Sequence, residues 1–302
     1  MTDLNGIICI NKPQDFTSFD VVAKMRGITH TRKIGHTGTL DPMATGVLPL
    51  LLGTATKASD LLPDDSKAYV ADFQLGCTTD TDDIWGTVLK QGAASFCRSE
   101  VEEKLALFCG EISQVPPMYS AIQVNGQRLY DIARKGVVIE RAPRRVTILS
   151  LRLLEFDEAG QKGKFEISCS KGTYIRSICR DLGEALGSGG VMTGLVRTHA
   201  AGFGLSDCIT LEQAQAYAQE GNFSTVLRPV ERLFSSLPRI RLNEVQSRMF
   251  RNGVRLDLNR VRYRISDGYQ GVYDEENRFM GLAELNFEKM ELVVRKMFLE
   301  RK

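Results

Sequence analysis

One glycine-rich stretch, residues 35–46 (GHTGTLDPMATG), constrains this chain more than any other segment. It holds three glycines and a single carboxylate, Asp41, and it leads directly into the apolar segment Val47–Leu52. Glycine tolerates backbone conformations that other residues avoid, and it lets another molecule approach the main chain closely. Pro42 restrains the backbone after the acid and disfavours helical geometry at Asp41. We therefore expect a rigid loop that presents one carboxylate and is anchored by a buried segment.

The residues alone leave more than one interpretation of this loop open. The simplest is an ordinary turn in which Asp41 caps a helix or hydrogen-bonds its own backbone. The phosphate-binding spacing Gly-x-x-x-x-Gly-Lys-[Ser/Thr] is absent, and the three glycines are wrongly placed for a Gly-x-Gly-x-x-Gly dinucleotide fingerprint. A nucleotide cradle is therefore not expected here.

Length and composition limit the classes of protein to which the chain can belong. Its 302 residues and 43% hydrophobic content are enough for two domains with buried cores. No apolar run approaches the ~20 residues that span a membrane, and no signal peptide is visible. Seven cysteines without a Cys-x-x-Cys pair are typical of reduced thiols, and three histidines lack metal-ligand spacing. A soluble cytoplasmic protein without a bound metal is expected.

Positive charge is concentrated in two segments, although the net charge of the whole chain is only +2. Residues 128–145 carry six basic and two acidic side chains, and residues 239–264 carry eight arginines and two acidic side chains. Arginine binds phosphate in a bidentate manner and stacks on bases, so such patches favour a polyanion. Nucleic acid is the favoured partner.

Hydrophobic periodicity places several of these residues on secondary structure. Alternation over residues 67–76 predicts a strand with Tyr69 on its buried face. Residues 17–20 have the spacing of a capping box, which predicts the beginning of a helix. The apolar stripe that begins at Ile175 predicts another helix and excludes Arg176 from its buried face. A cation at a helix N-terminus gains nothing from the helix dipole, so Arg176 is expected to have a specific anionic partner.

Three motifs resemble one known family. The sequence GHTGTLDPMATGVLP resembles the signature of the bacterial tRNA pseudouridine synthase B family, and Ser170–Arg176 (SKGTYIR) resembles its second signature. Leu195–Thr198 (LVRT) is a weaker match, because the family usually has Leu-Arg-Arg-Thr and this chain has Val196. The resemblance covers about residues 6–203. It implies an enzyme that flips uridine 55 out of the tRNA T-loop and isomerises it to pseudouridine by rejoining the base through C5.

The resemblance implies three catalytic residues. Asp41 corresponds to the carboxylate that acts in cleavage and rejoining of the glycosidic bond, and Arg176 to the arginine that pairs with it. Tyr69 corresponds to the ring that packs against the target base, although its alternation alone is that of a core aromatic. This isomerisation has no redox step and no phosphoryl transfer, so neither a cofactor nor a metal is expected.

The resemblance assigns four further residues to contact with the RNA. Leu195 and Tyr69 would sandwich the flipped base, and His36 would fill the space that the base leaves. Tyr174 lies in the second signature, and Lys12 lies in a Lys-Pro pair that flanks the active site. From the residues alone, Lys12 would be a solvated loop lysine and His36 a loop histidine satisfied by backbone hydrogen bonds.

The resemblance also implies a fold and a division into domains. It implies an α+β pseudouridine synthase fold, with a mixed, mainly antiparallel sheet flanked by helices and a small C-terminal PUA-like β-barrel of short strands. The catalytic domain is expected at residues 1–236, with an RNA-gripping insertion at about 114–145, and the RNA-binding domain at 237–302. The implied partner is the T-arm of tRNA, with no membrane, no obligatory protein partner and a monomeric state.

Other functions compete with this interpretation. An RNA-binding or chaperone module without chemistry predicts that removal of Asp41 leaves function intact. A nucleoside or glycoside hydrolase needs a second carboxylate ~5–10 Å from the first, for which Asp20 and Asp80 are the sequence candidates. A third alternative is a different target uridine or a guide-RNA-dependent relative. The long extensions typical of such relatives are absent here, which favours a stand-alone enzyme.

Overall fold

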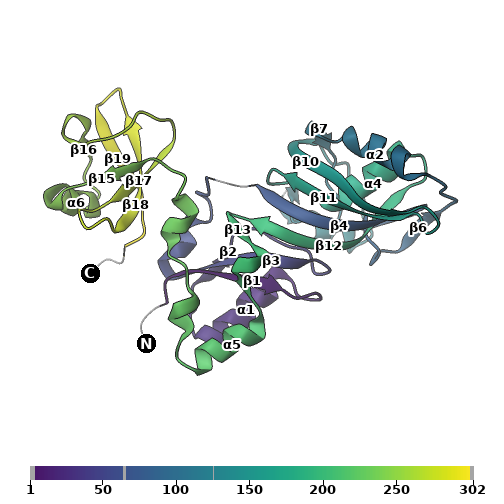
Figure 1. Ribbon diagram of the computed structural model, residues 1–302, viewed down its shortest axis with the longest axis horizontal. Coiled ribbons are helices and arrows are strands. Elements are labelled where there is room, and N and C mark those ends of the chain that lie inside the picture. Colours follow the sequence, from purple (N-terminus) through teal and green to yellow (C-terminus); the bar gives the residue numbers. More distant parts are fainter. Residues whose placement is uncertain (1–3, 64–65, 125, 300–302) are drawn as a thin grey trace.

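Two sheets organise the chain, a large one in the N-terminal and central part and a small one at the C-terminus (Figure 1). The computed structural model describes residues 4–63, 66–124 and 126–299. Over these ranges, the large sheet has ten strands and the small one five. No helix within them is long and apolar enough to cross a membrane.

The large sheet is mixed, which follows from the order and direction of its strands. Its main path is β14 (Cys208–Ile209), β1 (Gly6–Lys12), β3 (Thr45–Leu52), β12 (Gly190–Ala200), β4 (Lys67–Leu75), β11 (Lys162–Cys169), β10 (Arg144–Asp157) and β7 (Gly110–Gln114); β2 (Ile34–His36) pairs with β3, and β13 (Phe203–Gly204) with β12. The pairs β1–β14 and β3–β12 are parallel, and the other pairs are antiparallel. The predicted α+β fold with a mixed, mainly antiparallel sheet is confirmed.

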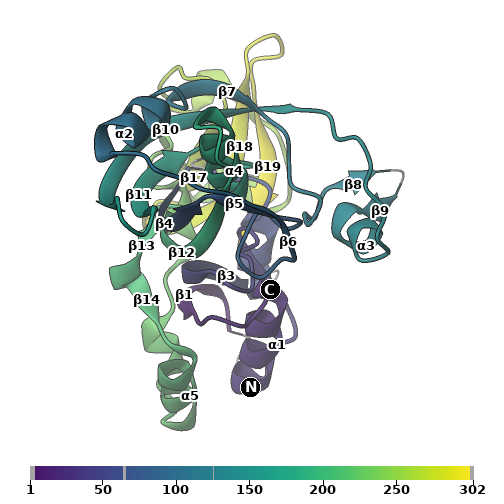
Figure 2. The same ribbon diagram turned by 90° about the vertical axis from the view of Figure 1, so that its right-hand side faces the viewer.

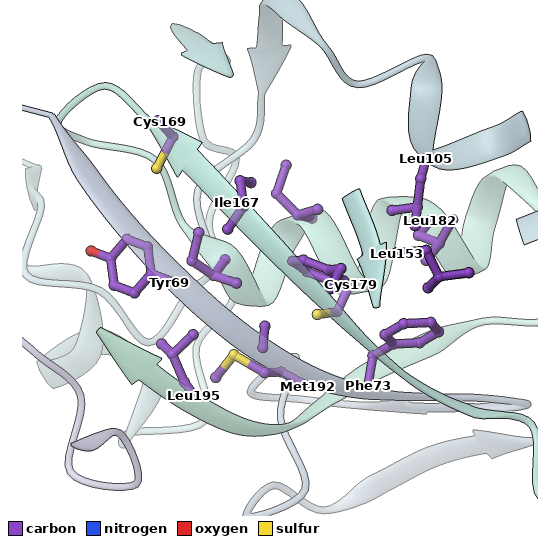
Figure 3. Close-up of a cluster of buried hydrophobic side chains, with 14 of the residues drawn as sticks. Tyr69, Phe73, Leu105, Leu153, Ile167, Cys169, Cys179, Leu182, Met192 and Leu195 are labelled. Carbon is purple, nitrogen blue, oxygen red and sulfur yellow. The ribbon is translucent and has the colours of Figure 1, made fainter. Parts of the chain in front are cut away.

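One core lies between the central strands and the helices α2 (Arg98–Ala106) and α4 (Ile175–Ala185) (Figure 3). Two patterns predicted from the sequence meet in it, because strand alternation and helical periodicity each bury one face. The alternating side chains of β4 and the apolar stripe of α4 supply the buried residues Tyr69, Ala71, Phe73, Leu75, Ile175, Ile178, Cys179 and Leu182. Truncation of a large side chain in such a core costs ~2–5 kcal/mol.

A second core lies where α1 (Ser18–Thr29) and α5 (Leu211–Gln219) cover β1 and β3. The predicted capping box is confirmed: the Asp20 N–H donates to Thr17 Oγ1, and the Thr17 N–H donates to Asp20 Oδ2. This cap fixes the first turn of α1, so that Val21, Val22 and Met25 point into the core.

The C-terminal sheet is curled and also carries a helix that was not predicted. Its order is β15 (Arg239–Arg241), β17 (Tyr269–Tyr273), β18 (Phe279–Asn286), β19 (Glu291–Met297) and β16 (Leu256–Asp257). The expectation of short strands alone missed α6 (Glu244–Arg251), because this helix is only eight residues long and buries only Ser247 and Phe250. Its signal in the sequence was the capping box of Asn243 and Gln246.

An aromatic cluster joins the small sheet to the large one. The ring of Phe234 lies 5.9 Å from that of Phe279 and 5.5 Å from that of Phe298, measured between centroids. These rings pack with Ile7 and Leu51 of the large sheet in one buried cluster. Burial of two or three aromatic rings at such a junction holds the two parts together.

Two smaller hairpins lie at the edge of the large sheet. One consists of β5 (Cys77–Thr79) and β6 (Val88–Gln91). The other consists of β8 (Gln123–Val124) and β9 (Gln127–Arg128), which is followed by α3 (Leu129–Ala133) and projects away from the sheet (Figure 2). Short 3₁₀ turns complete the description: η1 (Gly53–Ala58), η2 (Leu205–Asp207), η3 (Phe223–Val226), η4 (Val230–Phe234) and η5 (Leu258–Arg260).

Candidate active site

The loop between β2 and β3 presents Asp41 at the surface of the large sheet. The Asp41 side chain is 35% exposed, whereas the following strand β3 is buried along almost its whole length. Ser18 on α1 fastens the loop, since its hydroxyl donates to the Leu40 carbonyl and accepts from the Leu40 N–H. The predicted arrangement, a presented carboxylate followed by a buried anchor, is confirmed.

Arg197 on β12 holds the same loop from below, and sequence analysis did not identify it. Its side chain is completely buried, and its Nε donates to the Val47 carbonyl at 2.7 Å. Its two remaining nitrogens donate to the carbonyls of Thr39 and Gly38 at 3.2 and 3.3 Å. Gly46 lets the main chain of β3 lie close to the main chain of Arg197, because a Cβ at position 46 would lie 2.2 Å from the Arg197 carbonyl oxygen.

Lys12, at the end of β1, is a second buried cation beneath the loop. Its ammonium donates to the carbonyls of Pro13, Phe16 and Pro42, at 2.8, 2.6 and 3.2 Å. Burial lowers the pKa of Lys12 to about 8, while the nearby Asp41 carboxylate opposes the shift. The expectation of a solvated lysine is wrong. All three donors of the ammonium are engaged, so Lys12 supports the loop in this structure.

Arg176 meets Asp41 at the N-terminus of α4. The distance from Arg176 Nε to Asp41 Oδ2 is 2.9 Å, and the guanidinium also donates to the carbonyls of Thr81 and Tyr119. The side chain was expected to lie off the buried face of the helix, but it is buried, because the segments around Thr81 and Tyr119 cover it. The expected anionic partner is present. A charge-assisted pair with a buried arginine fixes the position of the carboxylate.

A second carboxylate, Asp83, lies on the other side of Arg176. Its Oδ2 is 3.8 Å from Arg176 Nη1, and its Oδ1 accepts from the Thr81 hydroxyl at 2.7 Å. The neighbouring Asp82 pairs with Arg180, one helical turn after Arg176, at 2.9 Å. Sequence analysis did not identify these partners. The available signal was two arginines at i and i+4 together with adjacent acids in one loop.

Tyr69 and Leu195 lie side by side on neighbouring strands at the end of the core nearest the loop (Figure 3). Both are buried, and they share their cluster with Leu40 and Met43 of the Asp41 loop. Burial raises the pKa of Tyr69 to about 12, so its hydroxyl stays protonated at neutral pH. The structure therefore places this ring and this aliphatic side chain next to the presented carboxylate.

Tyr174 and His36 flank the same region. Tyr174 caps α4, and its main chain forms two hydrogen bonds with the side-chain amide of Gln114. His36 ends β2, and its buried Nδ1 has no hydrogen-bond partner among the described residues. Burial and the charge of Arg197 lower the pKa of His36, which favours the neutral imidazole. A backbone hydrogen bond with Gly38 acts in the opposite direction on this pKa.

The carboxylates named for a hydrolase serve local roles instead. Asp20 closes the capping box of α1, and Asp80 Oδ1 accepts from the Thr87 N–H at 2.8 Å within its own hairpin. Among the described residues, no group of three or more His, Cys, Asp or Glu side chains is arranged to hold a metal ion. The arrangement around Asp41 is thus one exposed carboxylate, one buried arginine and a buried second acid.

The two basic segments differ in how much of their charge is available. On the projecting hairpin, the guanidinium groups of Arg128 and Arg134 lie 5.8 and 5.5 Å from the ring centre of Tyr130, and Arg128 Nη1 donates to the Tyr130 hydroxyl at 2.7 Å. In residues 239–264, by contrast, four of the eight arginines pair with acids of the same chain: Arg239, Arg251, Arg255 and Arg260. The second segment is therefore less cationic in the folded protein than its sequence indicates.

Comparison with known proteins points in one direction. Residues 26–175 match the model of the "TruB family pseudouridylate synthase (N terminal domain)", and residues 176–235 that of the "tRNA pseudouridylate synthase B C-terminal domain". The tRNA pseudouridine synthase B of Clostridium kluyveri is 40% identical over 96% of this chain and 100% of its own length. That of Alkaliphilus oremlandii is 44% identical over 85% of this chain and 84% of its own length.

Solved structures agree on the fold. The crystal structure of a Cbf5-Nop10-Gar1 complex contains a chain that superposes with a TM-score of 0.76 and 25% identity, over 97% of this chain and 85% of that one. The structure of an H/ACA RNP bound to a substrate RNA containing 2′-deoxyuridine gives a TM-score of 0.75 at 24% identity, over 98% of this chain and 86% of that one.

The buried position of Lys12 leads to a prediction about stability and pH. Lys12 has a folded pKa of about 8, below its ordinary value of 10.5, so between these pH values the unfolded chain binds more protons than the folded one. The free energy of unfolding of the wild-type protein therefore increases as pH rises through that window, because of Lys12. Lys12→Met lacks the titrating group, so this increase does not occur in the variant. We expect the difference in unfolding free energy between wild type and variant to move in favour of wild type, by roughly 2–3 kcal/mol between pH 7 and 10.

Urea unfolding of both proteins at a series of pH values measures this difference. Subtracting the unfolding free energy of the variant from that of wild type at each pH removes the contributions of groups that titrate equally in both proteins. The matched control is Lys24→Met, since Lys24 lies on the exposed face of α1. A wild-type minus Lys12→Met difference that does not depend on pH contradicts the argument.

Proposed function

Because this chain belongs to the TruB family of pseudouridylate synthases and isomerises uridine to pseudouridine in tRNA, we propose that Asp41 is its catalytic residue. We propose uridine 55 of the T-loop as the target. The observation that supports this assignment is the half-exposed Asp41 carboxylate, held 2.9 Å from the buried Arg176 in a loop that cannot relax.

The reaction needs little more than one positioned carboxylate. The N1–C1′ bond breaks, the uracil turns, C5 bonds to C1′, and the proton on C5 is lost while N1 gains one. Substrate and product have the same atoms and the same oxidation level. Asp41 serves first as nucleophile or base and then as its counterpart, while Arg176 holds its orientation throughout. The two acids considered for a hydrolase, Asp20 and Asp80, are engaged in local hydrogen bonds, which favours isomerisation over hydrolysis.

The surroundings of Asp41 suit a flipped base. A stacked uridine must leave the RNA loop before its glycosidic bond can be reached, at a cost of a few kcal/mol. We assign the apolar floor formed by Tyr69 and Leu195 to the extruded base. We assign His36 to the space that the base leaves in the RNA, and Tyr174 to the edge of the site.

The projecting hairpin and the small sheet complete the proposal. We assign residues 1–236 to catalysis, the insertion at about 114–145 to gripping the T-arm, and residues 237–302 to further RNA contact. The cluster of Arg128, Tyr130 and Arg134 supports the second assignment, since it offers positive charge to phosphate. We further propose that the enzyme works in the cytoplasm as a monomer, a state that sedimentation of the purified chain measures.

Removal of the Asp41 charge tests the central assignment. Asp41→Asn keeps the size of the side chain, so we expect the variant to bind an unmodified T-arm stem-loop as wild type does. The rate of conversion should fall by at least ~10²–10⁴, as expected when an acid–base group is lost. Binding is measured by fluorescence anisotropy of labelled RNA, and conversion by chromatography of the digested nucleosides. Conversion at the wild-type rate excludes Asp41, and binding without conversion by either protein favours an RNA-binding module.

Asp83 tests whether the second acid supports Arg176. In Asp83→Asn the hydrogen bonds to Oδ1 can be kept while the charge behind Arg176 is lost, so the guanidinium is held less firmly. We expect kcat to fall about tenfold, a loss near 1.4 kcal/mol, with KM for the RNA unchanged. The matched control is Asp82→Asn, which faces Arg180 and should lower kcat less. Equal losses in the two variants contradict a specific role for Asp83.

A further inference from the structure

The β5–β6 hairpin exposes four large apolar side chains beside the active site. Ile84 and Trp85 are 49% and 50% exposed, and Val88 and Leu89 are 57% and 63% exposed. Apolar groups gathered on a protein surface mark a place of contact with another molecule. We call these four residues the hairpin surface. The proposed mechanism does not use it.

The hairpin surface is tied to the catalytic carboxylate by a continuous series of contacts. The Trp85 N–H donates to Asp83 Oδ1 at 3.0 Å, and the other oxygen of this carboxylate faces Arg176, which binds Asp41. The Ile84 N–H donates to the Met192 carbonyl of β12 at 3.0 Å. The backbone under Ile84 and Trp85 is therefore fixed to the same buried residues that hold Asp41.

The chemistry of the hairpin surface suits the base or ribose of a nucleotide. Asp82 and Asp83, which directly precede these side chains, form ion pairs with Arg180 and Arg176, so these two acids do not repel RNA strongly. An exposed indole next to a site for a flipped nucleotide can stack on a neighbouring unpaired base, and such stacking does not depend on sequence. RNA loops offer unstacked bases of this kind.

We propose that Trp85, supported by Ile84, is a stacking platform for an unpaired T-loop base next to the flipped uridine. This rests on the proposed function and adds a specificity contact to it. An apolar stack releases no counterions, so its contribution to affinity does not depend on salt, unlike that of the arginines on the projecting hairpin.

Fluorescence tests this directly, since Trp85 is the only tryptophan of the chain. Titration of the Asp41→Asn protein with T-arm stem-loop RNA should quench the tryptophan emission. Trp85→Ala should raise the Kd and the KM about tenfold, with kcat and the slope of log Kd against log salt unchanged. The control Leu149→Ala, which removes an exposed apolar side chain from β10, should change none of them. Arg128→Ala should instead reduce the salt slope by about one.

Two results overturn the proposal. The first is that RNA does not quench the tryptophan emission and Trp85→Ala binds the RNA with wild-type affinity. The second is self-association of the protein that Trp85→Ala abolishes, which would assign the surface to a second copy of the chain. Conversion by wild type is measured first. Its absence is a failure of the proposed function, and its presence with an unaffected Trp85→Ala is a failure of the stacking platform alone.

A separate observation concerns two thiols at the other end of the large sheet. Cys9 on β1 and Cys208 on β14 are directly paired in parallel register, and both face the cluster that joins the two sheets. The Cys208 thiol donates to the Gly204 carbonyl at 3.5 Å. Neighbouring strands lie about 4.8 Å apart, which is within the Cα separation that a disulfide bridges. All seven cysteines of the chain are free in the structure.

The two thiols differ in the way that a peroxide-reactive pair requires. Cys9 is buried, and the neighbouring Cys208 and burial raise its pKa. Cys208 is half-buried, and the neighbouring Cys9 thiol lowers its pKa. Of the two sulfurs, the more accessible one therefore ionises more readily, and oxidation begins there.

We propose that Cys9 and Cys208 form a dithiol modification site that closes to a disulfide on oxidation by a peroxide. The Cys208 thiolate attacks one peroxide oxygen, the O–O bond breaks, and hydroxide leaves, which gives a sulfenic acid. The Cys9 sulfur then attacks Cys208 Sγ and loses its proton, the S–O bond breaks, and the hydroxide that leaves takes up a proton as water. Two thiols are oxidised by two electrons, and one peroxide is reduced to two waters.

Mass spectrometry of the full chain after treatment with hydrogen peroxide tests this site. We expect a loss of two hydrogens, a Cys9–Cys208 peptide after digestion, and a higher Tm, because the crosslink closes a long loop of the unfolded chain. Dithiothreitol should reverse all three. Cys208→Ser should prevent the mass change, and Cys97→Ser, which alters a cysteine outside the pair, should not. Sulfinic or sulfonic acid at Cys208 without a crosslink, or a disulfide elsewhere, overturns the proposal.

Discussion

Two buried cations hold the loop on which the site depends. Arg197 and Lys12 donate to six main-chain carbonyls between them, four of which belong to residues 38–47. A glycine-rich loop has many conformations to lose, and its buried carbonyls would be costly without partners. The cations in turn would be costly to bury without those carbonyls. Loop and cations therefore stabilise each other, and the carboxylate of Asp41 is fixed as a result.

Acidic and basic side chains alternate from Asp41 through Arg176 to Asp83. Arg176 lies between the exposed acid Asp41 and the buried acid Asp83, and Arg180 repeats the pairing one turn later with Asp82. Carbonyls of Thr81 and Tyr119 fill the remaining donors of Arg176, so the guanidinium can neither rotate nor leave without exposing unpaired groups. In the role that we propose for it, Asp41 acts twice in one reaction, and a partner that does not move between the two steps keeps it in place.

The sequence predicted those parts of the molecule that depend on local patterns. The alternating apolar residues of β4 and the apolar stripe of α4 each predict one buried face, and the capping box predicts where α1 begins. The motif resemblance identified the loop of Asp41. It did not predict what depends on contacts between distant segments. Arg197 and Lys12 look like ordinary cations in the sequence, and Asp83 looks like one acid among several. Their roles arise only when β12, β1 and the β5–β6 hairpin meet the loop.

The replacement of a family arginine by Val196 can be understood in the same terms. Side chains alternate along β12, so Leu195 and Arg197 share the face of Tyr69, and Val196 points to the opposite face of the sheet. There it is half-buried, and its backbone pairs with Thr45 and Val70 as any residue could. The residues that hold the loop and form the floor of the site are therefore unaffected by this substitution. Its effect is confined to the face of the sheet that does not carry Asp41, which is why a weakened third motif is compatible with an intact site.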